Sequence, residues 1–322
     1  MKKDNLYTHY IAPFFQLWRH FGFQTAWNEM CFVLNRKRHP GDFARRVPTF
    51  QKYSHLITLL ERKYGHIVEK YAHYTPEEWN GENVGADAPI WVYWQQGFEH
   101  APEVVQDCFR SIKQHAGEHP VIALTGNNLK EYVDLPDYVW EKHRKGIFTH
   151  SFFSDILRFA LFAKYGGFWV DACDFFLNDR FFKEALRYPF YSVRGFDNDL
   201  KITRQLWSDG IMACGKGNKY PQLMQELLVA YCKQENYLID YFVSSCFQNV
   251  AYIRLMSLRR MFDAYPFNNT EFFTIRWNFA KAYDEATFQA ILKENSVINL
   301  TWRVDAKGEG ETYYKHLKQL IS

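Results

Sequence analysis

The chain has 322 residues, enough for one large domain or for a domain with an extension. Hydrophobic residues make up 47% of it and aromatic residues 19%, so material for a core is ample. The aromatic excess either fills that core or stacks on sugars and bases. A net charge of only +3 does not indicate a nucleic-acid partner.

The six cysteines show no CxxC spacing, so we expect free thiols in a reducing cytoplasm. The first residues are basic, but Gln16, Arg19 and His20 interrupt the apolar stretch that follows, and a small-residue cleavage site is missing. We therefore do not predict a signal peptide. We also expect no membrane span, because no run of about 18 apolar residues occurs.

Residues 1–85 are predicted to form a helical, basic N-terminal extension. Apolar residues recur at helical spacing after Pro13, which suits a first helical turn: Phe14, Leu17, Trp18 and Phe21. Basic residues then follow close together: Arg36, Lys37, Arg38, Arg45 and Arg46. Such a segment suits peripheral contact with the anionic inner membrane; an ordinary docking helix followed by a solvated basic loop is the alternative.

The remainder, residues 86–322, begins after a polar, glycine-containing stretch and alternates strands with helices. Strands are predicted over 90–94, 121–125 and 168–170, and helices over 102–115 and 151–164. This alternation predicts an α/β fold with a mainly parallel sheet and right-handed crossovers. Ligands of such sheets bind beyond the carboxyl ends of the strands, so we expect chemistry just after Trp94, Thr125 and Val170.

The most informative segment spans 154–174. Asp155 and Arg158 share one face of the predicted helix, which Ser151 or Ser154 is expected to cap. Gly166 and Gly167 then allow a tight turn into a strand that ends at Asp171.

Asp171 and Asp174, at and just beyond this strand end, suit Mg²⁺ or Mn²⁺, which prefer oxygen ligands and are commonly completed by substrate phosphates. The alternative is a structural Asp155–Arg158 pair beside solvent-facing loop carboxylates.

Four further residues are weaker candidates. Asp209 precedes a predicted strand, and Asp240 lies in a helix expected over 236–241; either could reach an acceptor or be a satisfied structural carboxylate. His150 is a capping or a site residue. Trp302 follows the strand-like segment 297–300 and is either a lid residue or a core tryptophan.

The string SDILR…YGGFWVDA resembles the motif of family 32-type glycosyltransferases and of the related capsular polysaccharide synthesis proteins. The segment PIWVYWQQG at 89–97 is similar to the first strand of the capsular group, and DLPDY at 134–138 to its linker before the motif helix. Two later segments, 210–218 and 236–241, also resemble that group. The likeness runs in the expected order from about 89 to 250.

The resemblance implies a GT-A fold with a Rossmann-like nucleotide-binding half, and a transferase that retains anomeric configuration. Its donor would be a nucleotide sugar, a UDP-sugar above all, and its acceptor a capsular or lipopolysaccharide-type glycan, free or lipid-linked. By the family pattern the donor and its metal ion meet residues of three segments: Tyr93, Trp94 and Gln95 at the base, Asp155 and Arg158 at the sugar and diphosphate, and Asp171 at the ribose, sugar or metal. A C-terminal aromatic residue closes over the donor in related transferases, which suggests Trp302.

One departure from the pattern bears on the metal. The second aspartate of the Asp-x-Asp motif is replaced by Cys173, and Asp174 comes one residue late. A cysteine is a soft partner for Mg²⁺ or Mn²⁺. A catalytically silent nucleotide-sugar-binding protein that scaffolds polysaccharide assembly is therefore the second hypothesis. A phosphatase that uses Asp171 as nucleophile is disfavoured, since that chemistry wants Asp and Thr where Cys173 and Phe175 stand.

Overall fold

A computed structural model describes residues 10–38, 42–306, 308 and 310–321 of the chain. Residues 1–9, on which part of the signal-peptide expectation depends, lie outside the described residues. The strands are β1 Ile90–Tyr93, β2 Val121–Leu124, β3 Gly167–Asp171, β4 Asp174–Phe176, β5 Phe190–Ser192, β6 Ile211–Cys214 and β7 Val297–Asn299. The helices are α1 Ala12–Phe21, α2 Phe23–Arg38, α3 Asp42–Glu69, α4 Pro76–Asn80, η2 Phe98–His100 (a 3₁₀ helix), α5 Glu103–His115, α6 Leu129–Tyr132, α7 Asp137–Arg144, α8 His150–Tyr165, α9 Arg180–Ala185, α10 Lys219–Gln234, α11 Val243–Arg254, α12 Met256–Asp263, α13 Glu285–Glu294 and α14 Tyr313–Gln319.

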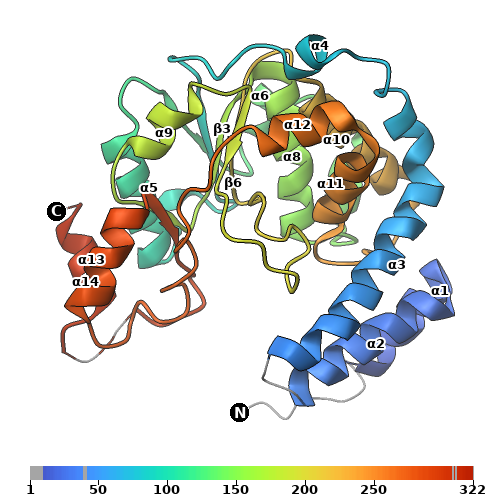
Figure 1. The fold of residues 1–322 in the computed structure, drawn as a ribbon, viewed down its shortest axis with the longest axis horizontal. Coiled ribbons are helices and arrows are strands. Elements are labelled where there is room, and N and C mark those ends of the chain that lie inside the picture. Colours follow the sequence, from blue (N-terminus) through green and yellow to red (C-terminus); the bar gives the residue numbers. More distant parts are fainter. Residues whose placement is uncertain (1–9, 39–41, 307, 309, 322) are drawn as a thin grey trace.

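The main sheet has the order β2-β1-β3-β6-β5 within the described residues. β1 pairs in parallel with both β2 and β3, whereas β6 runs antiparallel to β3 and to β5. All strands except β6 therefore point the same way, which confirms the predicted α/β class and the mainly parallel sheet. Helices α5 and α9 cover one face of this sheet and α8 and α10 the other (Figure 1).

The chain reverses its direction of winding at β1. β2 lies on one side of β1 and β3 on the other, so the carboxyl ends of β1 and β3 flank a topological switch point. In open α/β sheets ligands bind in the crevice at such a point. The pairing register places Tyr93 opposite Asp171 there, and this brings two predicted site residues from distant segments together.

The turn from α8 into β3 depends on two glycines. Gly166 has φ +66° and Gly167 has φ +103°, a region that residues with a side chain rarely adopt. A Cβ on Gly167 would also lie 2.4 Å from the carbonyl oxygen of Pro89. The expected capping residue was wrong: Thr149, not Ser151 or Ser154, caps α8, because its hydroxyl accepts the N–H of Phe152 at 3.2 Å.

The C-terminal segment forms a smaller unit beside the sheet. β4 pairs antiparallel with β7, and α13 and α14 lie next to this two-stranded sheet (Figure 1). A separate hydrophobic cluster holds the unit together and includes Phe175, Ile298 and Leu317. Val104 and Cys108 of α5 belong to the same cluster, so the unit is fixed to the main sheet through α5.

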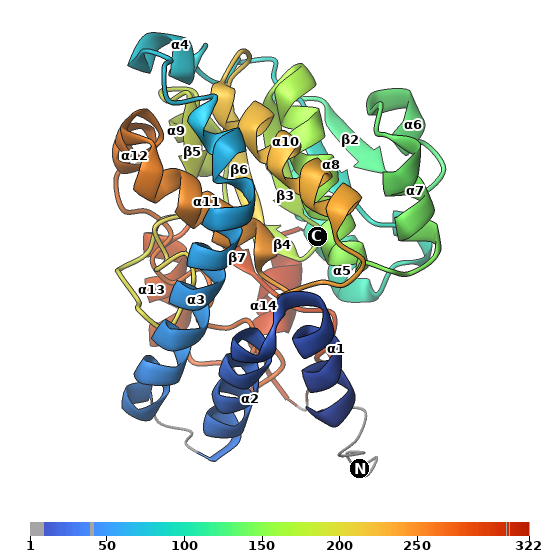
Figure 2. The same ribbon diagram turned by 90° about the vertical axis from the view of Figure 1, so that its right-hand side faces the viewer.

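The helical N-terminal extension has two differently packed parts. α3 lies against α11, and its residues Leu56, Leu60 and Tyr64 belong to the main hydrophobic core. α1 and α2 form a hairpin on the outer end of α3 (Figure 2). Among the described residues, no helix combines the length and the apolar character that crossing a membrane requires.

A buried ion triad ties this extension to the rest of the chain. The ammonium of Lys52 in α3 lies 2.6 Å from Glu29 in α2 and 2.7 Å from Asp240. Burial by itself lowers the pKa of Lys52, but the two carboxylates outweigh it, so that the pKa is raised. The helix expected over 236–241 is wrong: Asp240 instead accepts the N–H of Phe242, and α11 begins only at Val243.

The triad yields a stability prediction. Lys52→Met keeps most of the length of the side chain but leaves the buried carboxylate of Asp240 and the partly buried one of Glu29 without their cation. We therefore expect a loss of about 3–5 kcal/mol in the free energy of unfolding. Urea denaturation measures it. As a control, Lys183→Met removes a pair with Asp179 whose lysine is 72% exposed, which should change the free energy by less than about 1 kcal/mol. Equal effects of the two substitutions would contradict the prediction.

Candidate functional site

Helix α8 delivers the first pair of site residues. Asp155 and Arg158 are both buried although both can carry charge, with side-chain exposures of 12% and 3%. Nη1 of Arg158 donates to Oδ1 of Asp155 at 2.9 Å. Its guanidinium also lies over the ring of Trp169 at 4.9 Å. Because the i,i+3 spacing puts both side chains on one face of α8, the pair arises from local sequence.

Asp171 joins this pair from the end of β3. Its Oδ1 lies 3.5 Å from Nη2 of Arg158 and accepts a hydrogen bond from Nε1 of Trp169 at 2.9 Å. Its Oδ2 faces Gly210, where a Cβ would come within 2.9 Å. The side chain remains 45% exposed. Arg158 therefore links the two predicted carboxylates, and the one at the strand end opens to solvent.

Asp209 and Arg276 complete the charged group. The charge of Asp209 raises the pKa of Asp155 and of Asp171, so it lies near both. Its Oδ2 accepts from Ser245, whereas its Oδ1 is buried without a hydrogen-bond partner among the described residues. The positive charge of Arg276 acts in the opposite direction and lowers the pKa of Asp171. Sequence reasoning missed Arg276, since a lone arginine in the loop region 271–280 carries no local signal.

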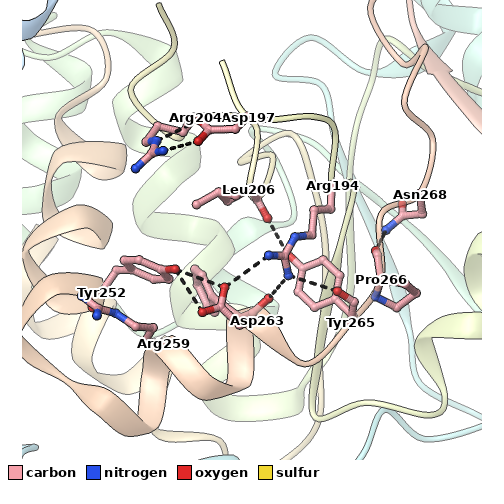
Figure 3. A network of polar contacts seen from close by, with 11 residues as sticks. Arg194, Asp197, Arg204, Leu206, Tyr252, Arg259, Asp263, Tyr265, Pro266 and Asn268 are labelled. Carbon is pink, nitrogen blue, oxygen red and sulfur yellow. Dashed lines mark hydrogen bonds and ion pairs between the residues drawn. The ribbon is translucent and has the colours of Figure 1, made fainter. Parts of the chain in front are cut away.

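A long loop between β5 and β6 carries Asp209 into this position. Arg194 at its start donates to the carbonyl oxygens of Phe262 and Tyr265 at 3.0 and 3.1 Å, and it pairs with Asp263 at 3.3 Å (Figure 3). Further along, Arg204 pairs with Asp197. These contacts hold the start and the middle of the loop, and Asp209 follows two residues before β6.

The surroundings of the carboxyl groups in the site raise their pKa values. Burial, followed in effect by the like charges nearby, raises the pKa of Asp155 to about 7 despite Arg158. Burial likewise raises the pKa values of Asp171 and Asp174. Asp209 adds a third carboxyl group near Asp155 and Asp171, beside the guanidinium groups of Arg158 and Arg276. A bound cation would favour the ionised form of these carboxyl groups.

Asp174 lies behind the opening rather than in it. A turn at residues 172–173 starts β4 at this position, where the side chain of Asp174 is fully buried. Its Oδ1 accepts from Nδ2 of Asn299 in β7 at 2.6 Å, and Oδ2 is buried without a hydrogen-bond partner among the described residues. The charge of Asp171 is near enough to raise the pKa of Asp174. The metal role of Asp174 stays a prediction.

A metal ion would find few protein ligands here. No group of three or more His, Cys, Asp and Glu side chains in the described part of the chain is arranged to hold one. The half-exposed carboxylate of Asp171 and the unpartnered Oδ1 of Asp209 fit a hard divalent cation whose other ligands are water or phosphate oxygens.

Aromatic side chains border the same strand ends. Trp302, 49% exposed, approaches Trp94 edge to face with ring centroids 6.3 Å apart. The interpretation of Trp302 as a core residue is therefore wrong. Leu300, just before it, is fixed by a 2.8 Å hydrogen bond from its N–H to the carbonyl oxygen of Cys173. The Tyr93 hydroxyl donates to Oε1 of Gln95. The three predicted base-contacting residues therefore occupy the last position of β1 and the turn that follows it.

A cavity of about 470 Å³ opens beside the ends of β1 and β2. Gln95 and Gly126 line it from the sheet, and Trp140, His143 and Phe153 from α7 and α8. The His143 ring stacks on Phe153 at 3.8 Å, and its Nδ1 is buried without a hydrogen-bond partner in the described chain. This size and this mixture of flat rings and polar atoms suit a small organic ligand.

Two weaker candidates do not join the site. Asp240 belongs to the structural triad, in which it and Glu29 both pair with Lys52. His150, the first residue of α8, is exposed and contacts the His143 ring at 4.9 Å. The structure therefore brings Asp155, Arg158 and Asp171 together and leaves these two outside.

One known protein family covers most of the chain. The family model described as capsular polysaccharide synthesis protein matches residues 43–317, most of the chain. The chain belongs to this family. Membership of the capsular polysaccharide synthesis proteins indicates a role in capsule biosynthesis. The match includes α3 and the C-terminal unit as well as the sheet. Comparisons with curated proteins and with solved structures found no match.

The buried carboxyl of Asp155 gives a prediction on pH. Its pKa is about 7 in the folded chain, against 3.8 ordinarily. In the window between these two pH values the folded chain therefore keeps a proton that the unfolded chain releases. The free energy of unfolding should therefore fall as pH rises through the window. Asp155→Asn, which still accepts a hydrogen bond from Arg158, should remove the part of this pH-dependent decrease that Asp155 causes. Urea denaturation at a series of pH values measures it. Asp179→Asn, an exposed control, should leave the decrease unchanged; parallel curves for all three proteins would contradict the prediction.

Proposed function

We propose that the protein is a glycosyltransferase that moves a sugar from a nucleotide-sugar donor to a capsular glycan acceptor. The observation that carries the proposal is the Asp155–Arg158–Asp171 group, which lies at the switch point of an α/β sheet in a capsular polysaccharide synthesis protein. A GT-A fold and a UDP-sugar donor are part of the proposal.

The donor would lie across the carboxyl ends of the strands. Tyr93, Trp94 and Gln95 would contact the base, with flat rings as stacking surfaces. Arg158 and Arg276 would face the diphosphate, since guanidinium groups match phosphate oxygens in charge and geometry. Asp155 holds Arg158 in place through its 2.9 Å hydrogen bond and so acts on the donor through it.

Asp171 would be the protein ligand of a metal ion, because its carboxylate is open to solvent at the end of β3. A divalent ion held by its carboxylate and by the donor phosphates would neutralise the charge that builds on the departing diphosphate. Asp174, fully buried, would act behind it by fixing the turn that follows β3. Cys173 replaces the second carboxylate of the motif, so most ligands of the ion would come from donor and water.

The transfer would retain anomeric configuration. The acceptor oxygen forms a bond to the anomeric carbon on the face that the diphosphate oxygen leaves, and the acceptor proton passes to that phosphate oxygen. The protein's contribution is then to position both reactants and to stabilise the leaving charge, without an obligatory base of its own. This agrees with a charged group made of carboxylates and arginines rather than a histidine.

Donor binding is tested first by thermal unfolding with a panel of nucleotides and nucleotide sugars, each with and without Mn²⁺ or Mg²⁺. A ligand at about a hundredfold over its Kd stabilises the folded chain by about 2.7 kcal/mol. We expect one nucleotide sugar to stabilise the protein more with metal than without. Failure of the whole panel to shift the unfolding temperature would remove the proposal's support.

Transfer itself is tested with Asp171→Asn. The substitution keeps the size of the side chain but removes the charge that would hold the ion, so kcat should fall by about 10²–10³-fold or more. The unfolding temperature should stay near that of the wild type. Asp179→Asn is the matched surface control. Near-normal turnover by Asp171→Asn would refute the proposed role.

Trp302 yields a separate prediction on donor affinity. If its ring covers the donor, Trp302→Ala should raise the KM for the donor about 3–10-fold, because an aromatic contact is worth about 0.5–1.5 kcal/mol beyond burial. The kcat should change less, since the contact holds the donor both before and during transfer. Trp302→Phe should recover most of the affinity. An unchanged KM for both variants would exclude the lid role.

A catalytically silent protein that binds nucleotide sugars and scaffolds assembly is the second candidate. Cys173 at the second motif position and the sparse metal ligands favour it. Donor binding without either transfer or donor hydrolysis, across a broad set of glycan acceptors, would support this alternative against the enzyme.

A further inference from the structure

The hairpin of α1 and α2 carries a row of exposed aromatic rings. Phe15 and Trp18 in α1 are 56% and 46% exposed, and Phe23 and Trp27 in α2 are 51% and 50% exposed. Consecutive members of the row contact one another, with ring centroids 5.9, 5.5 and 6.0 Å apart. Contiguous apolar surface of this kind is uncommon on soluble proteins and marks a site of association.

The opposite side of the hairpin is already used. Leu17, Thr25 and Ala26 are buried, and the Thr25 hydroxyl lies 3.0 Å from Nε2 of His55 in α3. The Lys52 triad fixes α2 to the same helix through Glu29. The aromatic row is therefore the outer face of an anchored hairpin, and it does not need to turn inward to stabilise the fold.

The charge of the hairpin has one predominant sign. Residues 10–38 contain the basic residues Arg19, Arg36, Lys37 and Arg38 against one acidic residue, Glu29. Glu29 is paired with Lys52, and the four basic side chains are exposed. Two copies of such a surface would repel each other if they met face to face, whereas an anionic surface would attract it.

The position of the hairpin suits a flat partner. It projects beyond the body of the protein in both views, on the side toward which β3 runs and on which β4 and β7 lie (Figures 1 and 2). A surface that met the hairpin would thus face the end of the molecule that carries Asp171.

We propose that the hairpin docks on the surface of an anionic lipid bilayer. The rings of Trp18 and Trp27 would enter the interfacial region, where tryptophan is favoured because it has an apolar body and a polar N–H. The exposed basic residues would lie at the anionic headgroups. This inference does not depend on the proposed transferase activity and holds or fails separately from it.

Co-sedimentation of the full chain with vesicles tests the proposal. We expect binding to vesicles of mixed phosphatidylglycerol and phosphatidylcholine, and much weaker binding to vesicles of phosphatidylcholine alone. The double variant Trp18→Ser/Trp27→Ser should bind at least about tenfold more weakly, since it loses the apolar area that would enter the interface. The matched control is Ile253→Ser/Met256→Ser, two residues 55% and 57% exposed outside the hairpin.

The charge contribution is tested with Arg36→Gln/Arg38→Gln. Each basic residue near an anionic surface contributes about fivefold in partition, so the pair should lower binding to the anionic vesicles by about 30-fold. Added salt should weaken binding by the wild type and affect the variant less. This variant leaves the aromatic rings intact, so it tests the proposal even if the tryptophan variant folds poorly. Thermal unfolding of each variant checks its fold.

Several results would overturn the proposal: no sedimentation of the wild type with anionic vesicles, equal binding to neutral vesicles, or unchanged binding by both hairpin variants. A wild type that is dimeric without lipid, and that becomes monomeric in Trp18→Ser/Trp27→Ser, would identify a second copy of the chain as the occupant instead.

Discussion

The guanidinium of Arg158 lies at the centre of the site, 97% of its side chain removed from solvent, between carboxylates that the chain delivers from two different elements. A buried arginine without partners would be very costly, so the pairing with Asp155 and Asp171 fixes how α8 and β3 must meet. The Gly166–Gly167 turn makes that meeting possible. The aromatic ring of Trp169 lies over the guanidinium and also holds Asp171, so sheet and helix are joined through one cation.

The surroundings of the carboxyl groups in this site disfavour their ionised form. Asp155, Asp171 and Asp174 all have raised pKa values, and burial is the largest cause for each. Burying carboxyl groups in this way lowers the free energy of unfolding. Groups with such perturbed pKa values are common at functional sites. Binding of a cation together with an anionic donor would turn the same groups into favourable partners.

The Lys52 triad is a second group of buried charges in the same molecule, with a structural role. There one buried ammonium satisfies two carboxylates, and its effect is to join α2, α3 and the segment before α11. It anchors the hairpin whose aromatic face remains open. Buried charge therefore has two uses in this fold: in the triad it joins helices, and at the strand ends it surrounds a carboxylate that opens to solvent.

The sequence by itself determined whatever depends on neighbours along the chain. The i,i+3 spacing of Asp155 and Arg158, the glycine turn and the strand ending at Asp171 could be predicted because short-range geometry governs them, and the alternation of strands and helices indicated the α/β class. Tertiary structure alone decided what depends on distant segments: that Arg276 approaches Asp171, that Trp302 meets Trp94, that Asp240 pairs with Lys52 rather than joining the site, and that Asp174 turns toward Asn299. Those contacts arise from the packing of elements far apart in sequence, and no local spacing encodes them.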